Sequence, residues 1–343
     1  MPNALKIIIP TAGWATRMRP QTWSKPKPLV GVAGKTALDH LLESFGSLPD
    51  PESIEYIFVL GPYLGETQIP PYMKEHYPKY KIHYVVQSVM RGQSDAIWLA
   101  REYLGGPTIM CYSDTLIETD FSFLAEPQTD SVAWVKSVPD PRRFGVAEVN
   151  EQGRITRLIE KPDSFENTLA VVGCYYFSEA RDLVSAIEEQ TRRGKSLRGE
   201  YFLADAINIM IERGLKMRTQ TVETWLDTGT VESTLETNRY LLEHGCGNTK
   251  TVRSEDSRIV PPVFVHPSAE IHHSTIGPYV SIGANCIVTD SRLESSILED
   301  GVTVETAAIK DSFIGRQARV VGHAASDPLM VLNVGDNSSI SFE

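Results

Sequence analysis

The chain has 343 residues, enough for about two domains, and is 41% hydrophobic and 22% charged, proportions typical of globular proteins. Asp and Glu number 44 against 33 Lys and Arg, and the net charge of −11 argues against a protein that coats nucleic acid, so an anionic ligand needs a local basic site. The sequence contains no apolar run of about 18 residues and no signal-peptide pattern, so we expect a cytoplasmic protein without a membrane partner. Its four scattered cysteines favour reduced, mostly buried thiols over disulfides or a zinc site.

Short β-rich runs alternate with longer amphipathic segments over residues 1–243, the pattern of an α/β domain with a mostly parallel mixed sheet. We expect strands at 6–9, 56–60, 82–87, 107–112, 131–138, 171–177 and 217–222. Helices are expected at 37–45, 94–102, 180–193, 203–212 and 230–243. The polar stretch 244–258 predicts a linker.

Residues 259–343 change character, because aliphatic residues recur there at every fifth or sixth position. This spacing favours a parallel β-helix of hexapeptide repeats, with coils of roughly 18 residues that stack aliphatic side chains inward. Small or polar residues would turn the corners. An antiparallel sandwich of short strands is the alternative.

Four cations stand within eleven positions after the first expected strand: Arg17, Arg19, Lys25 and Lys27. Ligands of open α/β sheets bind beyond the carboxyl ends of the strands, so this loop predicts a concentrated anion such as a phosphate. The alternative is a solvated basic loop. Gly34-Lys35-Thr36 is not a P-loop, because Leu29 stands where the earlier glycine is required, and no strand is followed by G-x-G-x-x-G.

The same loop holds an ordered set of motifs: Gly13, Thr16-Arg17, Pro20-Gln21-Thr22 and Pro26-Lys27-Pro28-Leu29. In these residues the sequence resembles the sugar-phosphate nucleotidyltransferase family. The resemblance continues over nearly the whole first domain, at Val85-Val86-Gln87, Gly92, Tyr112-Ser113-Asp114, Phe144-Gly145-Val146, Glu160-Lys161-Pro162, Gly173, Gly199-Glu200, Asp205-Ala206 and the run from Trp225 to Thr230. The stretch from Val334 to Ser338 is similar to the long-form branch that transfers thymidylyl groups to glucose-1-phosphate. The resemblance implies a Rossmann-like nucleotidyltransferase domain followed by a left-handed parallel β-helix.

The implied reaction is attack of a sugar-1-phosphate oxygen on the α-phosphorus of a nucleoside triphosphate, with release of pyrophosphate. The nucleophile is already an anion, so catalysis consists of positioning two polyanions and neutralising charge. Asp114 and Asp227 each follow an apolar run and fall on the family's metal positions, and their oxygens suit Mg²⁺, the implied cofactor. Without the family, each aspartate is an ordinary loop residue.

The other roles follow from the resemblance. Arg17 would clamp the β- and γ-phosphates and Lys27 would meet the α-phosphate, so the expected catalytic residues are Arg17, Lys27 and Asp114. Lys25 and Arg19 are expected only to add to the electrostatic field. The expected nucleotide-binding residues are Ala12, Gly13, Thr16, Arg17, Lys27, Gln87 and Gly92, of which Gln87 and Gly92 would read the base.

Four residues are implied to bind the sugar-1-phosphate: Gly145, Glu160, Lys161 and Gly173. Lys161 would hold the phosphate, and Glu160 would accept hydrogen bonds from sugar hydroxyls. Without the family, Glu160 and Lys161 are one more exposed ion pair. Gln93 or Ser94 is expected near the start of the next helix.

One departure from the family concerns the loop, which usually reads Gly-Gly-x-Gly-Thr-Arg. Ala12 and Ala15 replace two of these glycines. Alanine tolerates a positive φ poorly, so Ala15 would either weaken the hold on the triphosphate or adopt a negative φ. A non-catalytic regulatory homologue, and uridylyl or guanylyl transfer to glucose- or mannose-1-phosphate, are the alternatives to thymidylyl transfer.

The tail has two open interpretations. Its histidines, at positions 266, 272, 273 and 323, would allow acyl transfer, as in other hexapeptide β-helices. We instead expect assembly or regulation, because a short β-helix exposes faces and ends that need covering, and therefore a homo-oligomer. A chain ending near Cys246 is then expected to retain transferase activity.

Overall fold

The structure, a computed structural model, describes residues 4–126, 130–194, 196, 199–252, 254–322 and 329–342. The chain divides into two compact units, which we call the sheet unit (Met1–Trp14 with Leu41–Trp225) and the β-helix unit (Ala15–His40 with Leu226–Glu343). The helix α1 (Ala37–Ser44) and the strand β13 (Trp225–Asp227) lie where the chain passes between them. His323 falls outside the described residues.

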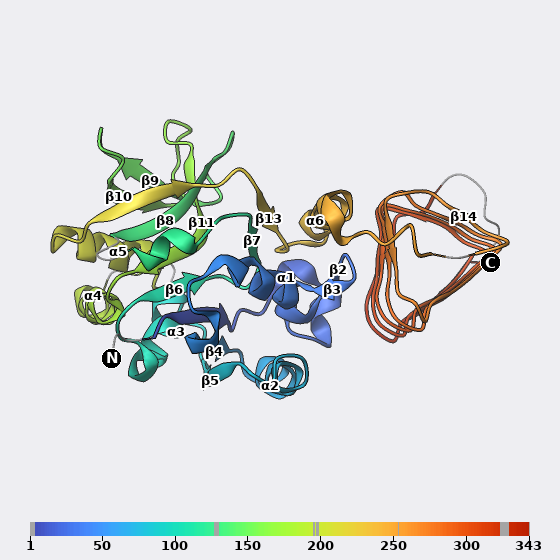
Figure 1. Cartoon of the computed structure of the whole chain (residues 1–343), viewed down its shortest axis with the longest axis horizontal. Helices are drawn as coiled ribbons and strands as arrows, with labels where there is room; N and C mark the ends of the chain where they lie inside the picture. The colour runs from blue at the N-terminus through green and yellow to red at the C-terminus, as the bar shows by residue number, and fades with distance from the viewer. Residues whose placement is uncertain are drawn as a thin grey trace. The chain divides into compact units, whose positions relative to one another are not determined.

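The sheet unit is built on a mixed sheet with the strand order β10-β9-β11-β6-β1-β4-β5, in which β8 pairs with β11 and β12 (Figure 1). Parallel pairs join β1 to β4 and β6, β4 to β5, and β8 to β12, whereas β11 runs antiparallel to β6, β8 and β9, and β10 to β9. The strands are β1 (Lys6–Thr11), β4 (Glu55–Leu60), β5 (Lys81–Val86), β6 (Thr108–Cys111), β8 (Ser131–Ser137), β9 (Gly145–Val149), β10 (Ile155–Glu160), β11 (Leu169–Phe177) and β12 (Met217–Thr221). Each expected strand is therefore present to within one or two residues.

The helices of the sheet unit follow their sequence signals at most places. The helix α4 (Ala180–Arg193) begins after Glu179, whose side chain accepts a hydrogen bond from the backbone of Arg181, and ends at Gly194 in the left-handed conformation. The others are α2 (Leu64–His76), α3 (Gln93–Leu99) and α5 (Leu203–Glu212), with shorter elements at η4 (Phe45–Ser47), η5 (Pro51–Ser53), η6 (Arg101–Tyr103), β7 (Thr115–Ile117) and η7 (Ser122–Ala125). None of the helices in the described part of the chain is long and apolar enough to cross a membrane.

The core of the sheet unit lies between the sheet and α3, α4 and α5. Ile8 and Ile57 come from the parallel strands, and Leu183 and Ile207 come from α4 and α5; all four are buried. Cys111 and Cys174 are also buried, as expected for thiols. Burial of this apolar surface is the main stabilising contribution to the unit.

The β-helix unit stacks its strands in three parallel sheets, which form the triangular coils of Figure 1 and agree with a left-handed β-helix. One sheet contains β14 (Arg258–Ile259), β17 (Thr275–Ile276), β20 (Arg292–Glu294) and β23 (Ala308–Lys310). The second contains β15 (Val263–Val265), β18 (Val280–Ile282), β21 (Ile297–Leu298), β24 (Phe313–Ile314) and β26 (Asn333–Val334). The third contains β16 (Glu270–His272), β19 (Ile287–Thr289), β22 (Thr303–Glu305), β25 (Arg319–Val321) and β27 (Ser339–Ser341).

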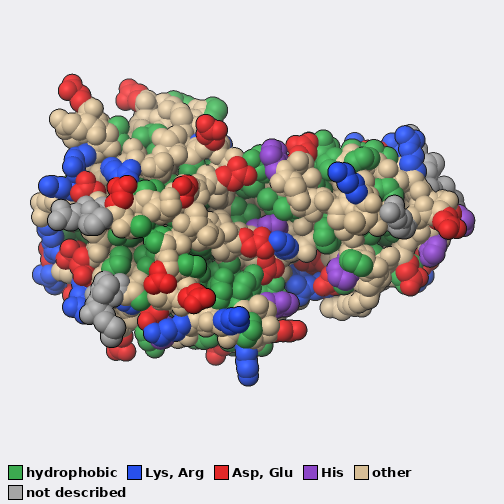
Figure 2. Space-filling model, in the orientation of Figure 1, with side chains coloured by type: hydrophobic (Ala, Val, Ile, Leu, Met, Phe, Trp, Pro, Cys, Tyr) green, Lys and Arg blue, Asp and Glu red, His purple; other side chains and the backbone are tan. Residues whose placement is uncertain are grey.

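Aliphatic side chains fill the interior of the coils. Val263, Ile282, Val304 and Ile314 are all buried there, so the prediction of a β-helix is confirmed and the antiparallel sandwich is wrong. On the face of the molecule shown in Figure 2, charged side chains of both signs lie at the surface of the coils.

The first coils are slightly shorter than the roughly 18 residues expected, whereas the last described coil is longer, since Arg319 pairs with Ser339, 20 positions later. Thr275 pairs with Arg292, 17 positions later, and Arg292 pairs with Ala308, 16 positions later. Tight corners explain the shorter coils, because single residues there adopt left-handed backbone angles and turn the chain without a longer loop. Such residues recur along the corners, at Asn285, Gly301, Gln317 and Asn337.

The N-terminal segment 15–40 belongs to the same compact unit as the β-helix. We call it the signature segment; it contains η1 (Thr16–Met18), η2 (Gln21–Trp23), η3 (Lys27–Leu29), β2 (Gly31–Val32), β3 (Lys35–Thr36) and the start of α1. Met18 and Val30 are buried against Val231 of α6 (Val231–Leu241) and against Ile297 and Phe313 of the β-helix. The signature segment and the β-helix therefore share one small apolar core.

The expected linker 244–258 is not simply extended chain. Its first residues complete a short turn, η8 (Leu242–Cys246). Asn248 then makes two hydrogen bonds with the backbone of Val265, at 2.8 and 2.9 Å. These bonds fix the chain against the first coil.

Candidate active site

The signature segment presents two of the three expected catalytic groups. Arg17 is exposed on η1, and Lys27 is half-buried at the start of η3. The segment has this path because prolines precede η2 and η3 and favour short turns over a regular helix. An exposed guanidinium and a half-buried ammonium suit the binding of a phosphate chain.

Ala15 adopts the conformation that the sequence made questionable. Its φ is 46° and its ψ is 41°, in the left-handed region, so Ala15 does not adopt the negative φ that would have avoided the strain. The carbonyl oxygen of Ala15 accepts hydrogen bonds from the backbone of Met18 and, at 2.9 Å, from Thr22 Oγ1. These bonds stabilise the turn against the cost of about 1–2 kcal/mol for a left-handed alanine.

Ala12 and Gly13 directly follow the strand β1 in the sheet unit. Ala12 is buried, and a Cβ placed on Gly61 would lie 2.8 Å from the Ala12 carbonyl oxygen. Gly13 is exposed, and a Cβ there would meet nothing within 4 Å. The backbone at Gly13 is therefore open to a ligand.

Lys25 differs from its expected role. It is buried to 1% exposure, and its ammonium pairs with Glu299 and, at 2.8 Å, with Asp336 of the β-helix. The expectation that Lys25 only adds to the field around a phosphate is wrong, because two carboxylates neutralise it. Arg19 is exposed, as expected.

Gln87 and Gly92, the expected base-reading residues, lie together at the start of α3. The amide Nε2 of Gln87 donates to the Gly92 carbonyl at 3.2 Å and to Asp95 Oδ2 at 2.8 Å. Gly92 has a φ of 101°, and a Cβ there would lie 2.6 Å from the backbone of Tyr201, so only glycine fits. The helix begins at Gln93, as expected.

Asp114 follows β6 and is half-buried. Its neighbour Tyr112 is packed against Gly173, where a Cβ would lie 2.5 Å from the tyrosine ring. Burial raises the pKa of Tyr112 well above its usual range, and the negative charges of Glu160 and Asp114 act in the same direction. Gly173 thus leaves space for the Tyr112 ring. Asp114 and Glu160 are both close enough to this ring to affect its hydroxyl electrostatically.

Glu160 and Lys161 end β10. Burial raises the pKa of the Glu160 carboxyl, while Lys161 opposes this shift and Asp205 adds to it. A Cβ on Gly145, the strand partner of Glu160, would lie 3.2 Å from Glu160 Oε2. Lys161 is exposed, with its Nζ 4.0 Å from Glu160 Oε1 and 5.0 Å from the ring centre of Phe202. Gly145, Glu160 and Lys161 therefore do form one cluster.

Asp227 begins a tightly built turn in the β-helix unit. Its Oδ1 accepts the Gly229 amide at 2.8 Å, and a Cβ on Gly229 would lie 2.7 Å from that oxygen. Thr230 then caps α6 through a reciprocal pair of hydrogen bonds with Ser233. The hydroxyl of Thr228, next to Asp227, is buried and has no hydrogen-bond partner in the described part of the chain.

The expected residues thus form separate groups within the two units. The sheet unit holds the groups around Gln87 and around Glu160, together with Asp114, and the β-helix unit holds Arg17, Lys27 and Asp227. Across the described ranges, three or more His, Cys, Asp or Glu side chains do not gather as a closed metal cage. Each group can therefore be described by its own chemistry.

Several residues of these groups were not predicted from the sequence. Asp95 and Tyr112 are close in sequence to predicted site residues. Their positions in the same motifs are the feature of the sequence from which they could have been predicted. Glu299 and Asp336 carry no local signal, because their partner Lys25 lies 274 and 311 positions away. Asp336 does fall in the stretch from Val334 to Ser338 that the sequence singles out.

Comparisons with known proteins match both parts of the chain to described families. The nucleotidyl transferase profile matches residues 6–244, and the GMPPB C-terminal domain profile matches residues 259–339. A glucose-1-phosphate thymidylyltransferase of Streptomyces antibioticus is 32% identical over 371 residues, which cover 99% of this chain and all of that protein. The UTP--glucose-1-phosphate uridylyltransferase AglF of Haloferax volcanii is 28% identical over 246 residues, covering 70% of this chain and 97% of its own. The structure of a UDP-glucose pyrophosphorylase complexed with UDP-glucose shares the fold, with a TM-score of 0.57, 21% identity, and coverage of 71% of this chain and 100% of that one.

Proposed function

Because this chain belongs to the nucleotidyl transferase family, we propose that it transfers a nucleotidyl group to a sugar-1-phosphate, with dTTP and glucose-1-phosphate as the favoured substrates. A phosphate oxygen of the sugar-1-phosphate forms a bond to the α-phosphorus, and the bond from that phosphorus to the β-phosphate oxygen breaks. Pyrophosphate leaves with the electron pair. The observation that carries the proposal is the full-length similarity to a glucose-1-phosphate thymidylyltransferase.

The hydrogen bonds of Gln87 support a particular class of base. Both N–H groups of its amide are used, by the Gly92 carbonyl and by Asp95. The amide oxygen is then the atom that can accept a hydrogen bond from a base. Thymine, uracil and guanine carry a ring N–H on their pairing edge, whereas adenine and cytosine carry an acceptor there. We infer a base of the first group, in agreement with thymidylyl transfer.

The groups around Glu160 suit the second substrate. An ionised carboxylate accepts hydrogen bonds from sugar hydroxyls, and the exposed ammonium of Lys161 can pair with the sugar's phosphate. Gly145 and Gly173 leave space for Glu160 and Tyr112, so we assign them a shaping role beside the sugar.

Arg17 and Lys27 would hold the triphosphate. A guanidinium binds two phosphate oxygens at once, which suits the β- and γ-phosphates. Lys27 would neutralise the charge that grows near the α-phosphorus as pyrophosphate leaves.

The donor set fits Mg²⁺. Asp114 and Asp227 supply hard carboxylate oxygens, and the buried hydroxyl of Thr228 without a partner in the described chain points to a ligand beside Asp227. A bound Mg²⁺ would offset negative charge on the phosphates. Asp227 is held in place for this role by the Gly229 amide.

The test is pyrophosphate release, measured with each common nucleoside triphosphate against several sugar-1-phosphates in the presence of Mg²⁺. We expect turnover with dTTP or UTP and glucose-1-phosphate, and none with ATP or CTP. Asp114→Asn and Asp227→Asn are expected to lower kcat strongly, with Asp290→Asn at a β-helix corner as the control. Release with no pair would overturn the proposal in favour of a regulatory homologue. Homo-oligomer formation and a cytoplasmic location stay predictions from the sequence.

A further inference from the structure

We propose that Lys25 is a positioning residue for this reaction: the β-helix residues Glu299 and Asp336 hold its ammonium, and thereby fix the signature segment that presents Arg17 and Lys27 to the triphosphate. The inference rests on the proposed function. It assigns the β-helix a part in the transferase site, beyond the assembly role expected from the sequence.

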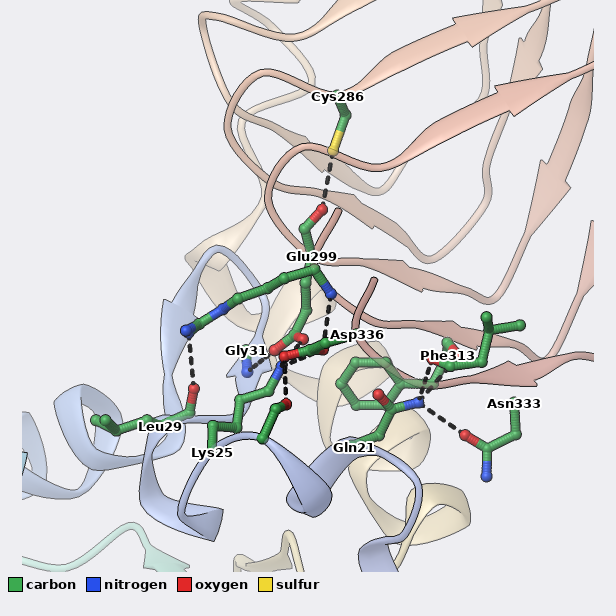
Figure 3. A network of polar contacts seen from close by, with 12 residues as sticks. Gln21, Lys25, Leu29, Gly31, Cys286, Glu299, Phe313, Asn333 and Asp336 are labelled. Carbon is green, nitrogen blue, oxygen red and sulfur yellow. Dashed lines mark hydrogen bonds and ion pairs between the residues drawn. The ribbon is translucent and has the colours of Figure 1, made fainter. Parts of the chain in front are cut away.

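The ammonium of Lys25 is enclosed by carboxylates (Figure 3). Its Nζ bonds Glu299 Oε2 and lies 2.8 and 3.0 Å from the two oxygens of Asp336. The exposed fractions of the three side chains are 1% for Lys25, 3% for Glu299 and 8% for Asp336. All three donor positions of the ammonium are therefore used inside the protein, and Lys25 is not available to a phosphate.

Glu299 is fixed at both ends. Its backbone carbonyl accepts a hydrogen bond from the thiol of Cys286 at 3.0 Å, within the neighbouring coil. Its Oε1 accepts the backbone N–H of Gly31 at 3.0 Å. One side chain of the β-helix thus holds the signature segment at Lys25 and again at Gly31.

Asp336 is held by the neighbouring coil while it binds the segment. Its Oδ1 accepts the backbone N–H of Arg316 at 2.9 Å, and its Oδ2 accepts Ser24 Oγ at 2.6 Å. A Cβ on Gly315 would lie 2.4 Å from Asp336 Oδ1, so a glycine is needed for this approach. The side chain of Arg316 in turn donates to the Leu29 carbonyl at 3.1 Å.

A second contact comes from Gln21 on η2. Its Nε2 donates to the backbone carbonyls of Phe313, at 3.1 Å, and Val334, at 3.0 Å, and to Asn333 Oδ1 at 2.7 Å. The stretch 333–336 therefore binds the segment through both backbone and side chains, which gives the motif singled out in the sequence a physical role.

These contacts lie on both sides of Lys27 and begin four positions after Arg17, the two cations proposed to bind phosphate. Arg17 and Lys27 lie eight and two positions from Lys25, in the same short segment of turns. Turns without a regular helix or sheet of their own are ordered by what they contact. A shift of about 1 Å in a positioned catalytic group can cost about 100-fold in rate, so loss of the β-helix contacts is expected to be felt at the phosphates.

The electrostatics agree with a positioning role. Two cations, Lys25 and Arg316, face two carboxylates, Glu299 and Asp336, so the cluster is close to neutral. A buried pair of this kind adds little to stability over apolar packing but fixes geometry, because each oxygen accepts a defined hydrogen bond.

The test compares wild type with Lys25→Met and Glu299→Gln. For the folded variants we expect kcat/KM for the nucleoside triphosphate to fall by about 100-fold, as for a mispositioned catalytic group. The KM for the sugar-1-phosphate should stay unchanged, because Glu160 and Lys161 lie in the other compact unit. Glu299→Gln keeps an oxygen for the Gly31 amide and serves if Lys25→Met does not fold.

Glu294→Gln is the matched control. It also removes a β-helix carboxylate paired with a cation, but its partner is Arg292 of the same strand, at 2.7 Å. We expect wild-type kinetics for this variant.

Amide hydrogen exchange gives a readout that does not depend on activity. In Lys25→Met and Glu299→Gln we expect faster exchange over residues 15–31, with protection of β1 and β4 unchanged. Wild-type kinetics per folded molecule, or unchanged exchange over 15–31, would overturn the inference. Pyrophosphate release by the wild-type protein tests the proposed function separately. A failure of the proposed function can therefore be distinguished from a failure of the positioning role of Lys25.

Discussion

Single glycines set the shape of the groups described above. Gly173 has a φ of 88°, and a Cβ there would lie 2.5 Å from the Tyr112 ring and 3.1 Å from Thr115 Oγ1. The resemblance implied that this glycine binds the sugar-1-phosphate. That role stays a prediction, and the geometry adds a second one, in which the glycine gives Tyr112 space beside Asp114 and Glu160.

We expect Gly173→Ala to lower the free energy of unfolding by about 2–4 kcal/mol, because the methyl group both overpacks the site and forces alanine to a positive φ. Gly153→Ala is the control, since Gly153 has a φ of 71° but no atom within 4 Å of an added Cβ. Urea denaturation of both variants measures the difference. Equal losses would show that backbone strain alone matters and that the Tyr112 contact does not.

Lys27 and Lys161 are expected to differ in kinetics. If Lys27 neutralises charge that develops at the α-phosphorus, Lys27→Ala lowers kcat at saturation, whereas Lys161→Ala mainly raises the KM for the sugar-1-phosphate. Steady-state kinetics with each substrate varied in turn separates the two effects. The reverse pattern would mean that the roles of the two cations are exchanged.

Glu160 predicts a pH dependence. Burial raises the pKa of its carboxyl, so protonation begins at a higher pH than for an exposed glutamate. The protonated acid accepts hydrogen bonds less well, so the KM for the sugar-1-phosphate should rise as the pH falls through this raised pKa. In Glu160→Gln the KM should be higher than in the wild type and should lack this rise at low pH. The effect of titrating the substrate phosphate should remain in both proteins. An identical rise of the KM at low pH in both proteins would exclude Glu160 as its cause.

At the scale of elements, the sequence predicted strands and helices where hydrophobic periodicity is strong. The strand β11, nine buried or half-buried residues, and the helix α4, with its amphipathic pattern, were expected nearly to the residue. The helix α2 was missed because Pro70 and Pro71 stand inside it and signal a break. The strands β9 and β10 were missed because each is partly exposed and carries few consecutive apolar residues.

The candidate site divides in the same way. Residues within contiguous motifs, such as Gln87 with Gly92 or Asp227 with Gly229, do lie together, since a few positions of chain connect them. The partners of Lys25 could not be predicted, because nothing local in a sequence specifies a contact across 311 positions. Its cationic side chain suggested a phosphate nearby. The structure shows that it is paired with two carboxylates.

At the scale of the whole molecule, the compact units are not consecutive in the chain. The sheet unit is interrupted by the signature segment, which groups with the C-terminal third of the protein. The contacts of this segment with the β-helix argue against the expectation that a chain ending near Cys246 keeps its activity. Without residues 247–343, Lys25, Gln21 and Gly31 lose the partners described above.

We expect the truncated protein to fold its sheet unit but to lose about 100-fold or more in pyrophosphate release, the cost of a misplaced catalytic group. Circular dichroism and light scattering on both proteins establish folding and oligomeric mass before activity is compared. Full activity in a folded truncated chain would show that the signature segment orders itself without the β-helix.

The long separation between Lys25 and Asp336 in the sequence also means that the ribosome synthesises the two residues at different times. A ribosome adds about 5–20 residues per second, so about 15–60 s pass between the emergence of the lysine and that of an aspartate 311 positions later. The sheet unit can form its core during this interval, since its last strand ends at Thr221. The signature segment has to wait for the final coil. A nascent or prematurely terminated chain that stops before Asp336 would thus carry every motif of residues 1–243 while its signature segment still lacks these contacts, so we expect the segment to become ordered only after this coil has been synthesised.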